Sequence, residues 1–248
     1  MFMSLLALPF LFSIFVGVGW NSISNLSTGV VALDNDDLTD FSGQGDAWVS
    51  DDKRLILTGD APRFRILHDY ENVNVTLFAK RVSEEKELDY QGIVVGARSQ
   101  HYDDSACGAN TYYARLTNNG KVSFEKELFH GEGRNAFYPN QDKVIFSDGV
   151  PRDKWIGFQF IVKTLANGNV NLQLILDYDG EWSKVLEYTD KGNWPVQDLT
   201  QDQVDKLCDG HYPINKIIQA PGFVFIRNDG LGDDGRSEYK GISIQELN

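Results

Sequence analysis

The residues that offer the most chemistry lie within three short stretches near the middle of the chain. Arginine and glutamine can bond the hydroxyls or the carboxylate of a sugar, and histidine transfers protons near neutral pH. Tyrosine covers the apolar side of a sugar ring. Such a set predicts a surface that binds a polysaccharide or transfers protons on one. Its members are Arg98, Gln100, His101, Tyr113, Arg115, Lys126 and His130.

The same residue types are those that β-elimination on a uronic-acid polymer requires. One group must neutralise the sugar carboxylate, a base must remove the proton beside it, and an acid must protonate the leaving oxygen. We expect Arg98 and Gln100 to grip the carboxylate, because alternate residues of a strand share a face. His101 or His130 would be the base and Tyr113 the acid. The further substrate-binding candidates are Arg65, Arg115 and Lys126.

Two carboxylate patterns suit retaining glycoside hydrolysis instead, which needs two carboxyl groups about 5 to 5.5 Å apart. Glu87 and Asp89 begin an alternating acidic pattern, but Gln91 stands where a second glutamate would complete it. Glu125 and Glu127 share one strand face, about 6.5 to 7 Å apart along the backbone. Because the acidic motif is incomplete, a hydrolase is the less favoured reaction.

The polar residues also fit two interpretations without catalysis. One is a carbohydrate-binding or laminin-G-like adhesion module, in which exposed aromatic rings serve as sugar platforms. The other is an ordinary solvated sheet face with cross-strand charge pairs. The tryptophans are candidates for sugar platforms, although such residues more often pack in a core or at its rim. They are Trp48, Trp155, Trp182 and Trp194.

Three consecutive strands are expected to position the polar cluster. They span residues 92–100, 111–116 and 122–130, and Asn118-Asn119-Gly120 makes the turn between the last two. In the third strand Val122, Phe124 and Leu128 face one side and the glutamates face the other. Strands that follow one another in sequence are usually neighbours in space. We therefore expect one sheet to carry the whole cluster.

The rest of the chain predicts an all-β protein, a two-sheet antiparallel β-sandwich. Roughly a dozen short strands alternate with turn signals such as Asn167-Gly168 and Asp179-Gly180. Helical periodicity is absent over long stretches, which argues against an α/β fold. One short helix is expected near Thr200 to Leu207.

The amino terminus predicts export. No charged residue precedes Asp34, and residues 5–18 form an apolar stretch whose length fits a secretory signal or a marginal membrane anchor. We divide the chain into a leader (1–25), a tether (26–45) and one β-sandwich domain (46–248). The expected location is secreted or extracellular, with an uncleaved leader as the single membrane attachment.

Cys107 and Cys208 are the two cysteines of the chain. In an exported protein an even pair forms a disulfide, which here would tie the loop after the strand 92–100 to a late loop. In the loop-entropy account, closing about a hundred residues is worth on the order of 4 kcal/mol. Two unrelated thiols in a cytosolic protein are the alternative, and the apolar amino terminus argues against it.

The net charge of −13 argues against nucleic acid as a partner for the surface as a whole. A local basic patch could still hold an acidic glycan. No cofactor motif is present, since the chain lacks a phosphate-binding glycine loop and a His-x-x-x-His pair. Structural Ca²⁺ is the one metal that the acidic turns suit, at residues 34–37 and 229–234.

The hairpins TYYARLTNNGKVSFEKEL and DKWIGFQFIVKTLANGNVNLQLILDYDGEW, with the closing strands GFVFIRND and YKGISIQEL, resemble the concanavalin A-like jelly roll of lectins and glucanases. The resemblance covers about residues 46–248. It is more distantly similar to the jelly-roll alginate lyases, which use Arg, Gln, His and Tyr on a concave sheet. Those enzymes place one residue between Gln and His, whereas Gln100 and His101 are adjacent. The family implies a polysaccharide ligand, but its members include binding modules, hydrolases and lyases.

Overall fold

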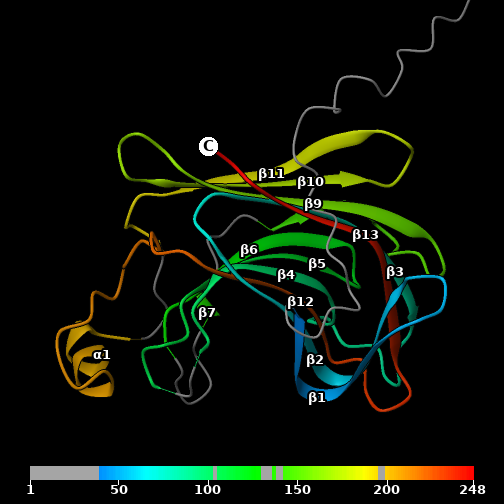
Figure 1. The fold of residues 1–248 in the computed structure, drawn as a ribbon, viewed down its shortest axis with the longest axis horizontal. Coiled ribbons are helices and arrows are strands. Elements are labelled where there is room, and N and C mark those ends of the chain that lie inside the picture. The colour runs from blue at the N-terminus through cyan, green and yellow to red at the C-terminus, as the bar shows by residue number, and fades with distance from the viewer. Residues whose placement is uncertain (1–38, 103–104, 130–135, 138–141, 195–198) are drawn as a thin grey trace, which may run out of the picture.

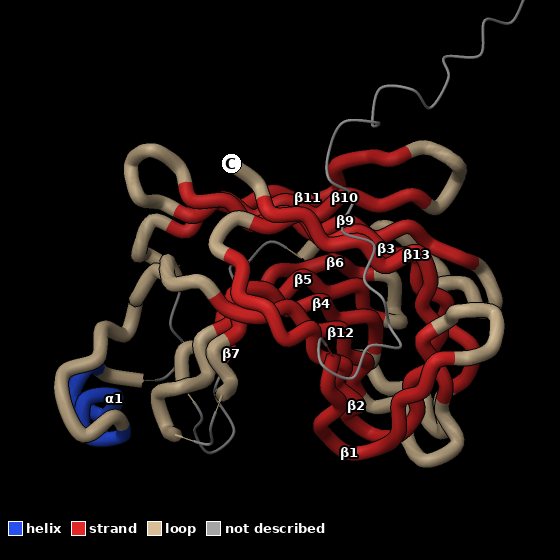
Figure 2. Tube along the Cα trace, viewed as in Figure 1, coloured by secondary structure: helices blue, strands red, loops and turns tan. Residues whose placement is uncertain are grey.

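The computed structural model describes residues 39–102, 105–129, 136–137, 142–194 and 199–248, which fold into a sandwich of two antiparallel sheets (Figure 1). Figure 2 shows strands nearly everywhere, with a helix at one end of the sandwich. The elements are β1 (Thr39–Val49), β2 (Leu55–Tyr70), β3 (Val73–Ser83), β4 (Gly92–Ser99), β5 (Thr111–Thr117), β6 (Lys121–Glu127), β7 (Ala136–Phe137), β8 (Lys143–Val144), β9 (Trp155–Thr164), β10 (Val170–Asp177), β11 (Trp182–Asp190), α1 (Gln201–Leu207), β12 (Gly222–Asp229) and β13 (Arg236–Glu246).

Hydrogen bonds run through both sheets in the order β11-β10-β9-β3-β13-β2-β12-β4-β5-β6-β7. We call β11-β10-β9-β3-β13 the first sheet and β12-β4-β5-β6-β7 the second. β2 belongs to both, because its residues 55–58 pair with β13 and its residues 63–70 pair with β12. The expected β-sandwich is therefore confirmed, with one long strand joining its two layers.

Glycines allow the hairpin of β1 and β2 to bend between the layers. The register shifts between Gln44 and Asp46, and Gly45 and Gly59 both have positive φ. A Cβ on Gly59 would lie 2.3 Å from the Cα of Gly45, so the two backbones approach too closely for any side chain. This bend carries the second half of β2, with Arg63 and Arg65, into the second sheet.

The core lies between the sheets and is built by alternation along the strands. Leu172, Leu174 and Leu176 of β10 are fully buried, as are Ala114 and Leu116 of β5. Across the sandwich, the rings of Phe124 and Phe160 stack with centroids 5.9 Å apart. Each strand thus has one apolar face in the core, and the opposite face of the second sheet is left to carry polar groups.

The disulfide between Cys107 and Cys208 is present, with Cα atoms 5.5 Å apart, so the predicted pairing is confirmed. It fixes the end of α1, the helix expected near Thr200, to the loop between β4 and β5. The Thr200 hydroxyl caps α1 by accepting a bond from the Gln203 N–H.

The leader and most of the tether lie outside the described residues, so their boundaries stay predictions. The last residues assigned to the tether, 39–45, are in β1, and residues 39–44 pair with β2. No helix within the described ranges is long and apolar enough to cross a membrane.

Candidate binding site on the outer face of the second sheet

The second sheet turns one face away from the core, and we call this its outer face. Alternation places Ile93 and Val95 of β4 in the core and Val94 on the outer face. A small apolar cluster lies there, formed by Val94, Tyr113, Phe223 and Phe225. The cluster gives the outer face a rigid centre, around which the charged residues are arranged.

Three arginines share one row across this face. Arg63 of β2 pairs in register with Arg227 of β12, which pairs with Val94 of β4, which in turn pairs with Arg115 of β5. Since residues paired in register point to the same side of a sheet, all three guanidinium groups belong to the outer face. The strand pairing therefore gathers cations from three separate parts of an acidic chain.

Carboxylates compensate two of the three arginines. Asp229 lies between them: its Oδ2 accepts a bond of 2.9 Å from Arg115 Nη2 and one of 3.0 Å from Arg227 Nη2. Arg115 Nη1 also lies 2.6 Å from Glu125 Oε2. Burial alone would lower the pKa of Arg227, but Asp229 and the neighbouring acids more than offset it, so its pKa is raised. Both arginines are thus held in fixed positions by carboxylates.

Arg63 differs from its two neighbours. It is half-buried, and its side chain makes no hydrogen bond or ion pair with any other residue that the structure describes. The exposed carboxylate of Asp60 lies on the same side of the molecule, in the bend of β2. Arg63 therefore keeps its full set of guanidinium donors for a ligand.

These groups line a pocket of about 540 Å³, which we call the arginine pocket. Tyr90 lines this pocket and is 56% exposed, and its ring lies beside Gly230, another lining residue. The lining is polar, with cationic, anionic and aromatic groups side by side. The full set of lining residues is Asp60, Ala61, Arg63, Tyr90, Arg115, Arg227, Asp229 and Gly230.

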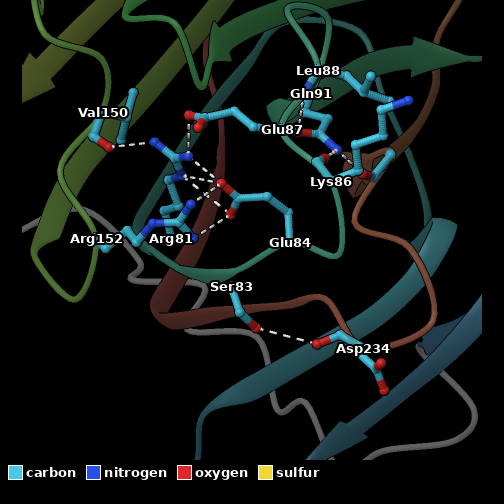
Figure 3. A network of polar contacts seen from close by, with 11 residues as sticks. Arg81, Ser83, Glu84, Lys86, Glu87, Leu88, Gln91, Val150, Arg152 and Asp234 are labelled. Atoms are coloured by element: carbon cyan, nitrogen blue, oxygen red, sulfur yellow. Dashed lines mark hydrogen bonds and ion pairs between the residues drawn. The ribbon is translucent and has the colours of Figure 1, made fainter.

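Gln91 holds the loops of the arginine pocket together (Figure 3). Its amide donates to the carbonyls of Lys86 and Gly230, and its carbonyl accepts a bond of 2.7 Å from the N–H of Leu88. Gly230 in turn donates its N–H to the carbonyl of Asp60 over 2.6 Å. Because Gln91 is completely buried, these bonds keep the walls of the pocket fixed before any ligand arrives.

A second polar group lies further along the outer face. The Tyr113 hydroxyl donates to Glu127, and His101 Nε2 lies 3.4 Å from Glu127 Oε2. Burial and the charge of Glu127 raise the pKa of Tyr113 well above its usual value. Burial would raise the pKa of Glu127 as well, but the bonds from His101 and Tyr113 outweigh burial and lower it. Tyr113 is completely buried, so its proton is committed to Glu127.

The structure separates Arg98 from this face, contrary to the expected alternation with Gln100. Arg98 has a φ of 53° and lies where β4 carries one residue more than β12, a β-bulge. Its guanidinium is fully buried and donates to the carbonyls of Glu71 and Ile218. Gln100 lies beyond the end of β4 and is bonded to Asn110. Arg98 thus braces the interior and does not reach the arginine pocket.

Lys126 is also directed inward. It shares the core face of β6 with Phe124, and its Nζ lies 2.8 Å from Asp190 Oδ2. Arg65 does lie on the outer face, where it pairs with Asp40 and packs over the ring of Phe223. His130 lies outside the described residues, so its predicted role as a base stays a prediction. Of the predicted set, the outer face brings together His101, Tyr113, Arg115 and Arg65.

The structure places the two carboxylate patterns, Glu87 with Asp89 and Glu125 with Glu127, in different settings. Glu87 pairs with Arg81 in a loop, and Gln91 is the brace described above, so this stretch forms no strand of acids (Figure 3). Glu125 and Glu127 do share the outer face, as their spacing predicts. Each is already bonded, to Arg115 and to Tyr113.

Four of the lining residues carry no functional signal in the local sequence: Arg63, Tyr90, Arg227 and Asp229. Arg227 belongs to the closing strand GFVFIRND, and Asp229 begins an acidic turn. The sequence does show an arginine at an alternating position of each strand. These arginines form a site only because the strands pair, and local sequence does not reveal which strands pair.

No protein-family model matches the chain, and no curated protein matches its sequence. Solved structures share its architecture. The carbohydrate-binding module CBM66 of Bacillus subtilis aligns with a TM-score of 0.51 at 9% identity, over 84% of this chain and 97% of that chain. The fold is a concanavalin A-like jelly roll. At this identity the likeness carries the architecture alone.

Two lectin-type structures align with this jelly roll to a similar degree. The exoplasmic/lumenal domain of VIP36, in a Ca²⁺- and Man3GlcNAc-bound form, has a TM-score of 0.50 at 14% identity, over 85% of this chain and 84% of its own. Arcelin-5, a lectin-like defence protein of Phaseolus vulgaris, has a TM-score of 0.50 at 10% identity, over 85% and 92%.

Among the described residues of this jelly roll, no group of three or more His, Cys, Asp or Glu side chains is placed to hold a metal ion. The predicted Ca²⁺ turn at residues 34–37 lies outside them. In the other predicted turn, Asp229 is bonded to Arg115 and Arg227. Ca²⁺ binding therefore stays a prediction.

None of the described tryptophans lines the arginine pocket. Trp194 is 1% exposed and packs in the core against Tyr112, so it offers no platform to a sugar. Trp182 is 42% exposed and lies against Gly157 of the first sheet, and Trp155 stacks beneath Lys240. Tyr90 is the exposed ring at the pocket itself.

Proposed function

We propose that the protein binds a polysaccharide at the arginine pocket and does not cleave it. One observation carries the proposal: an open pocket in which three arginines, two carboxylates and the exposed Tyr90 converge. A guanidinium group donates hydrogen bonds to sugar hydroxyls and a carboxylate accepts them, while a tyrosine ring covers the apolar face of the sugar. The buried Gln91 supports binding further, because a pre-formed site loses less conformational entropy when it is occupied.

The architecture supports a carbohydrate ligand by analogy. The aligned structures include a carbohydrate-binding module and a lectin-type domain in a Man3GlcNAc-bound form. A shared fold does not carry a shared ligand, and this likeness only raises the expectation of a sugar. The partner we propose is an extracellular polysaccharide, with no nucleic acid partner. The same proposal includes export through the amino-terminal leader. It also leaves open the binding of a structural Ca²⁺ ion.

Cleavage of a uronic-acid polymer is the second candidate, and the geometry favours it less. Tyr113, the expected acid, is completely buried and donates its proton to Glu127. Arg98, the expected carboxylate clamp, is bonded to backbone carbonyls in the interior. His101 and Arg115 remain on the outer face, so the lyase is a hypothesis that a direct assay must address.

The test uses the full chain and a panel of neutral and acidic polysaccharides. Affinity electrophoresis measures retardation by each polymer, and absorbance near 235 nm follows the unsaturated product of β-elimination. We expect retardation by at least one polymer without new absorbance. Retardation should be reduced at least several-fold in Tyr90→Ala, whose ring is exposed, and unchanged in Trp48→Ala, an exposed ring on β1. Absorbance on any uronate polymer would replace the proposal by the lyase, and no retardation by any polymer would end it.

A further inference from the structure

We infer that the sugar held at the arginine pocket carries a carboxylate, and that Arg63 is the residue that binds it. The inference rests on the proposed function and adds to it the chemical class of the ligand and the residue that selects it. It is based on the strand register, the charge pairing and the composition of the pocket wall.

The first observation is a like-charge pair built into the sheet. Arg63 and Arg227 are register partners across the ladder between β2 and β12. Like charges directly opposite one another destabilise a sheet. On the other side of Arg63, its register partner in β1 is Ser42, which brings no compensating charge. Such a cation lowers the stability of the free protein. Its presence in a pocket is expected when an anionic ligand binds there, because the anion removes the repulsion.

The second observation is the unequal pairing of the three arginines. Asp229 contacts both Arg115 and Arg227, whereas no described residue pairs with Arg63. Arg65, which also lies on the outer face, is paired with the carboxylate of Asp40. A planar guanidinium with free donors matches a carboxylate in a bidentate arrangement, which a lysine would not reproduce.

The third observation sets the number of charges on the ligand. Of the three lining arginines, Arg115 and Arg227 are compensated by Asp229 and Glu125, which leaves Arg63 as the lining cation without a carboxylate partner among the described residues. One such charge suits a sugar with a single carboxylate, whose hydroxyls can donate to Asp60. A densely sulfated polymer would instead bring several anions close to two carboxylates. The pocket therefore favours a uronic-acid residue over a sulfated one.

The experiment compares each acidic polymer with its carboxyl-reduced form, which has the same backbone but no charge. The probes are polyglucuronate, alginate and pectate, the three matched neutral polymers and dextran sulfate, which carries sulfates but no carboxylate. Dissociation constants are measured by calorimetry. We expect at least one uronate polymer to bind at least tenfold more tightly than its reduced form and than dextran sulfate. That preference should weaken as salt is raised, because a partly exposed ion pair is screened.

The variants are Arg63→Gln, Arg63→Lys and the control Lys154→Gln. Lys154 is exposed, precedes β9 and has no ion pair with a described residue, so its substitution removes the same charge elsewhere. Arg63→Gln should weaken binding of the uronate polymer tenfold or more, the loss expected for one charged hydrogen bond, and leave the reduced polymer within about twofold. Arg63→Lys should recover part of the loss, and Lys154→Gln should bind like the parent.

The outcomes separate the two levels of the proposal. Equal binding of acidic and reduced polymers, or unchanged uronate binding by Arg63→Gln, overturns the carboxylate inference and leaves glycan binding standing. Binding of no polymer at all removes the proposed function and the inference with it. Thermal unfolding of each variant serves as the folding control, and Arg63→Gln should be no less stable than the parent because a like-charge pair is lost.

Discussion

Lys126 and Asp190 form an ion pair in the interior of the sandwich, with Nζ 2.8 Å from Oδ2 and exposures of 1% and 0%. Lys126 belongs to β6 of the second sheet and Asp190 to β11 of the first, so the pair bridges the two layers. The Tyr112 hydroxyl donates to Asp190 Oδ2 over 2.6 Å, and the N–H of Gly192 donates to Oδ1 over 3.0 Å. Burial lowers the pKa of Lys126, although Asp190 opposes this shift.

Removing one member of this pair should destabilise the protein more than removing both. In Lys126→Met the carboxylate of Asp190 stays buried without its cation, and we expect a loss of about 3–5 kcal/mol in the free energy of unfolding. The double variant Lys126→Met/Asp190→Leu should lose less than the single one, because no uncompensated charge remains. Urea unfolding at pH 7 measures both. A single variant within about 1 kcal/mol of the parent would show that the pair is not closely packed.

The position of Lys126 was available from the sequence, while its role was not. Its alternation with Phe124 and Leu128 placed it on the apolar face of β6, and the structure agrees. Residue type alone suggests a lysine that binds a substrate, whereas this periodicity directs its side chain toward the core. Asp190, sixty-four residues further on, could not be recognised as its partner because that contact depends on how the two sheets pack.

Arg98 illustrates a different limit. A β-bulge at the end of β4 breaks the alternation that was expected to place Arg98 and Gln100 on one face. Nothing local requires the bulge, since an arginine at φ 53° is unfavourable by itself and is held by the bonds its guanidinium makes. The strands and the fold class follow local periodicity, whereas this irregularity depends on tertiary contacts.

Arg98→Met should therefore damage stability and spare binding. The substitution leaves the carbonyls of Glu71 and Ile218 and the hydroxyl of Thr164 without the guanidinium donors they accept from. We expect a loss of about 2–4 kcal/mol in the free energy of unfolding, from several unsatisfied groups. Glycan affinity of the folded protein should stay within about twofold of the parent, since Arg98 does not line the pocket. If Arg98→Met had normal stability but lost glycan affinity, Arg98 would have to be counted among the binding residues.

The arginine pocket shows why a site can be hidden in a correctly predicted fold. Arg63 and Arg227 are far apart in the sequence, and they meet because β2 pairs with β12 across a long connection. Alternation assigned each of them to a strand. The pairing order of the strands is a property of the whole jelly roll, and without it the row of cations could not be recognised.

Acid should weaken the protein through Glu238. This carboxylate is 4% exposed and is surrounded by Lys80 at 2.8 Å, Arg236 at 2.7 Å and Arg54. Burial would raise its pKa, but the three cations outweigh burial and lower it below 4.5. The folded protein then holds this proton less readily than the unfolded chain. Its stabilising effect is present above about pH 4.5 and is lost as the pH falls through the lowered folded pKa.

Glu238→Gln provides the check on this pH dependence. The free energy of unfolding, measured from pH 7 to pH 3, should fall less steeply below pH 4.5 in the variant than in the parent, while at pH 7 the variant should be the less stable of the two. Glu246→Gln, the same change at an exposed position near the end of β13, serves as the control and should follow the parent curve. Identical slopes for Glu238→Gln and the parent would assign the acid sensitivity to other carboxylates.

Loss of the disulfide should lower the free energy of unfolding without changing the affinity of the arginine pocket for its ligand. Cys107 and Cys208 are 101 residues apart in sequence, and opening a loop of this length in the unfolded chain is worth about 4–5 kcal/mol in the entropic account. Cys107→Ser/Cys208→Ser should lose about that amount, and a phosphine reductant should reproduce the loss in the parent. The reductant should not affect the double variant, which makes that variant its own control. Neither cysteine lines the arginine pocket, so affinity should persist in the folded double variant; a coupled loss of affinity would place the α1 end of the molecule in the binding site.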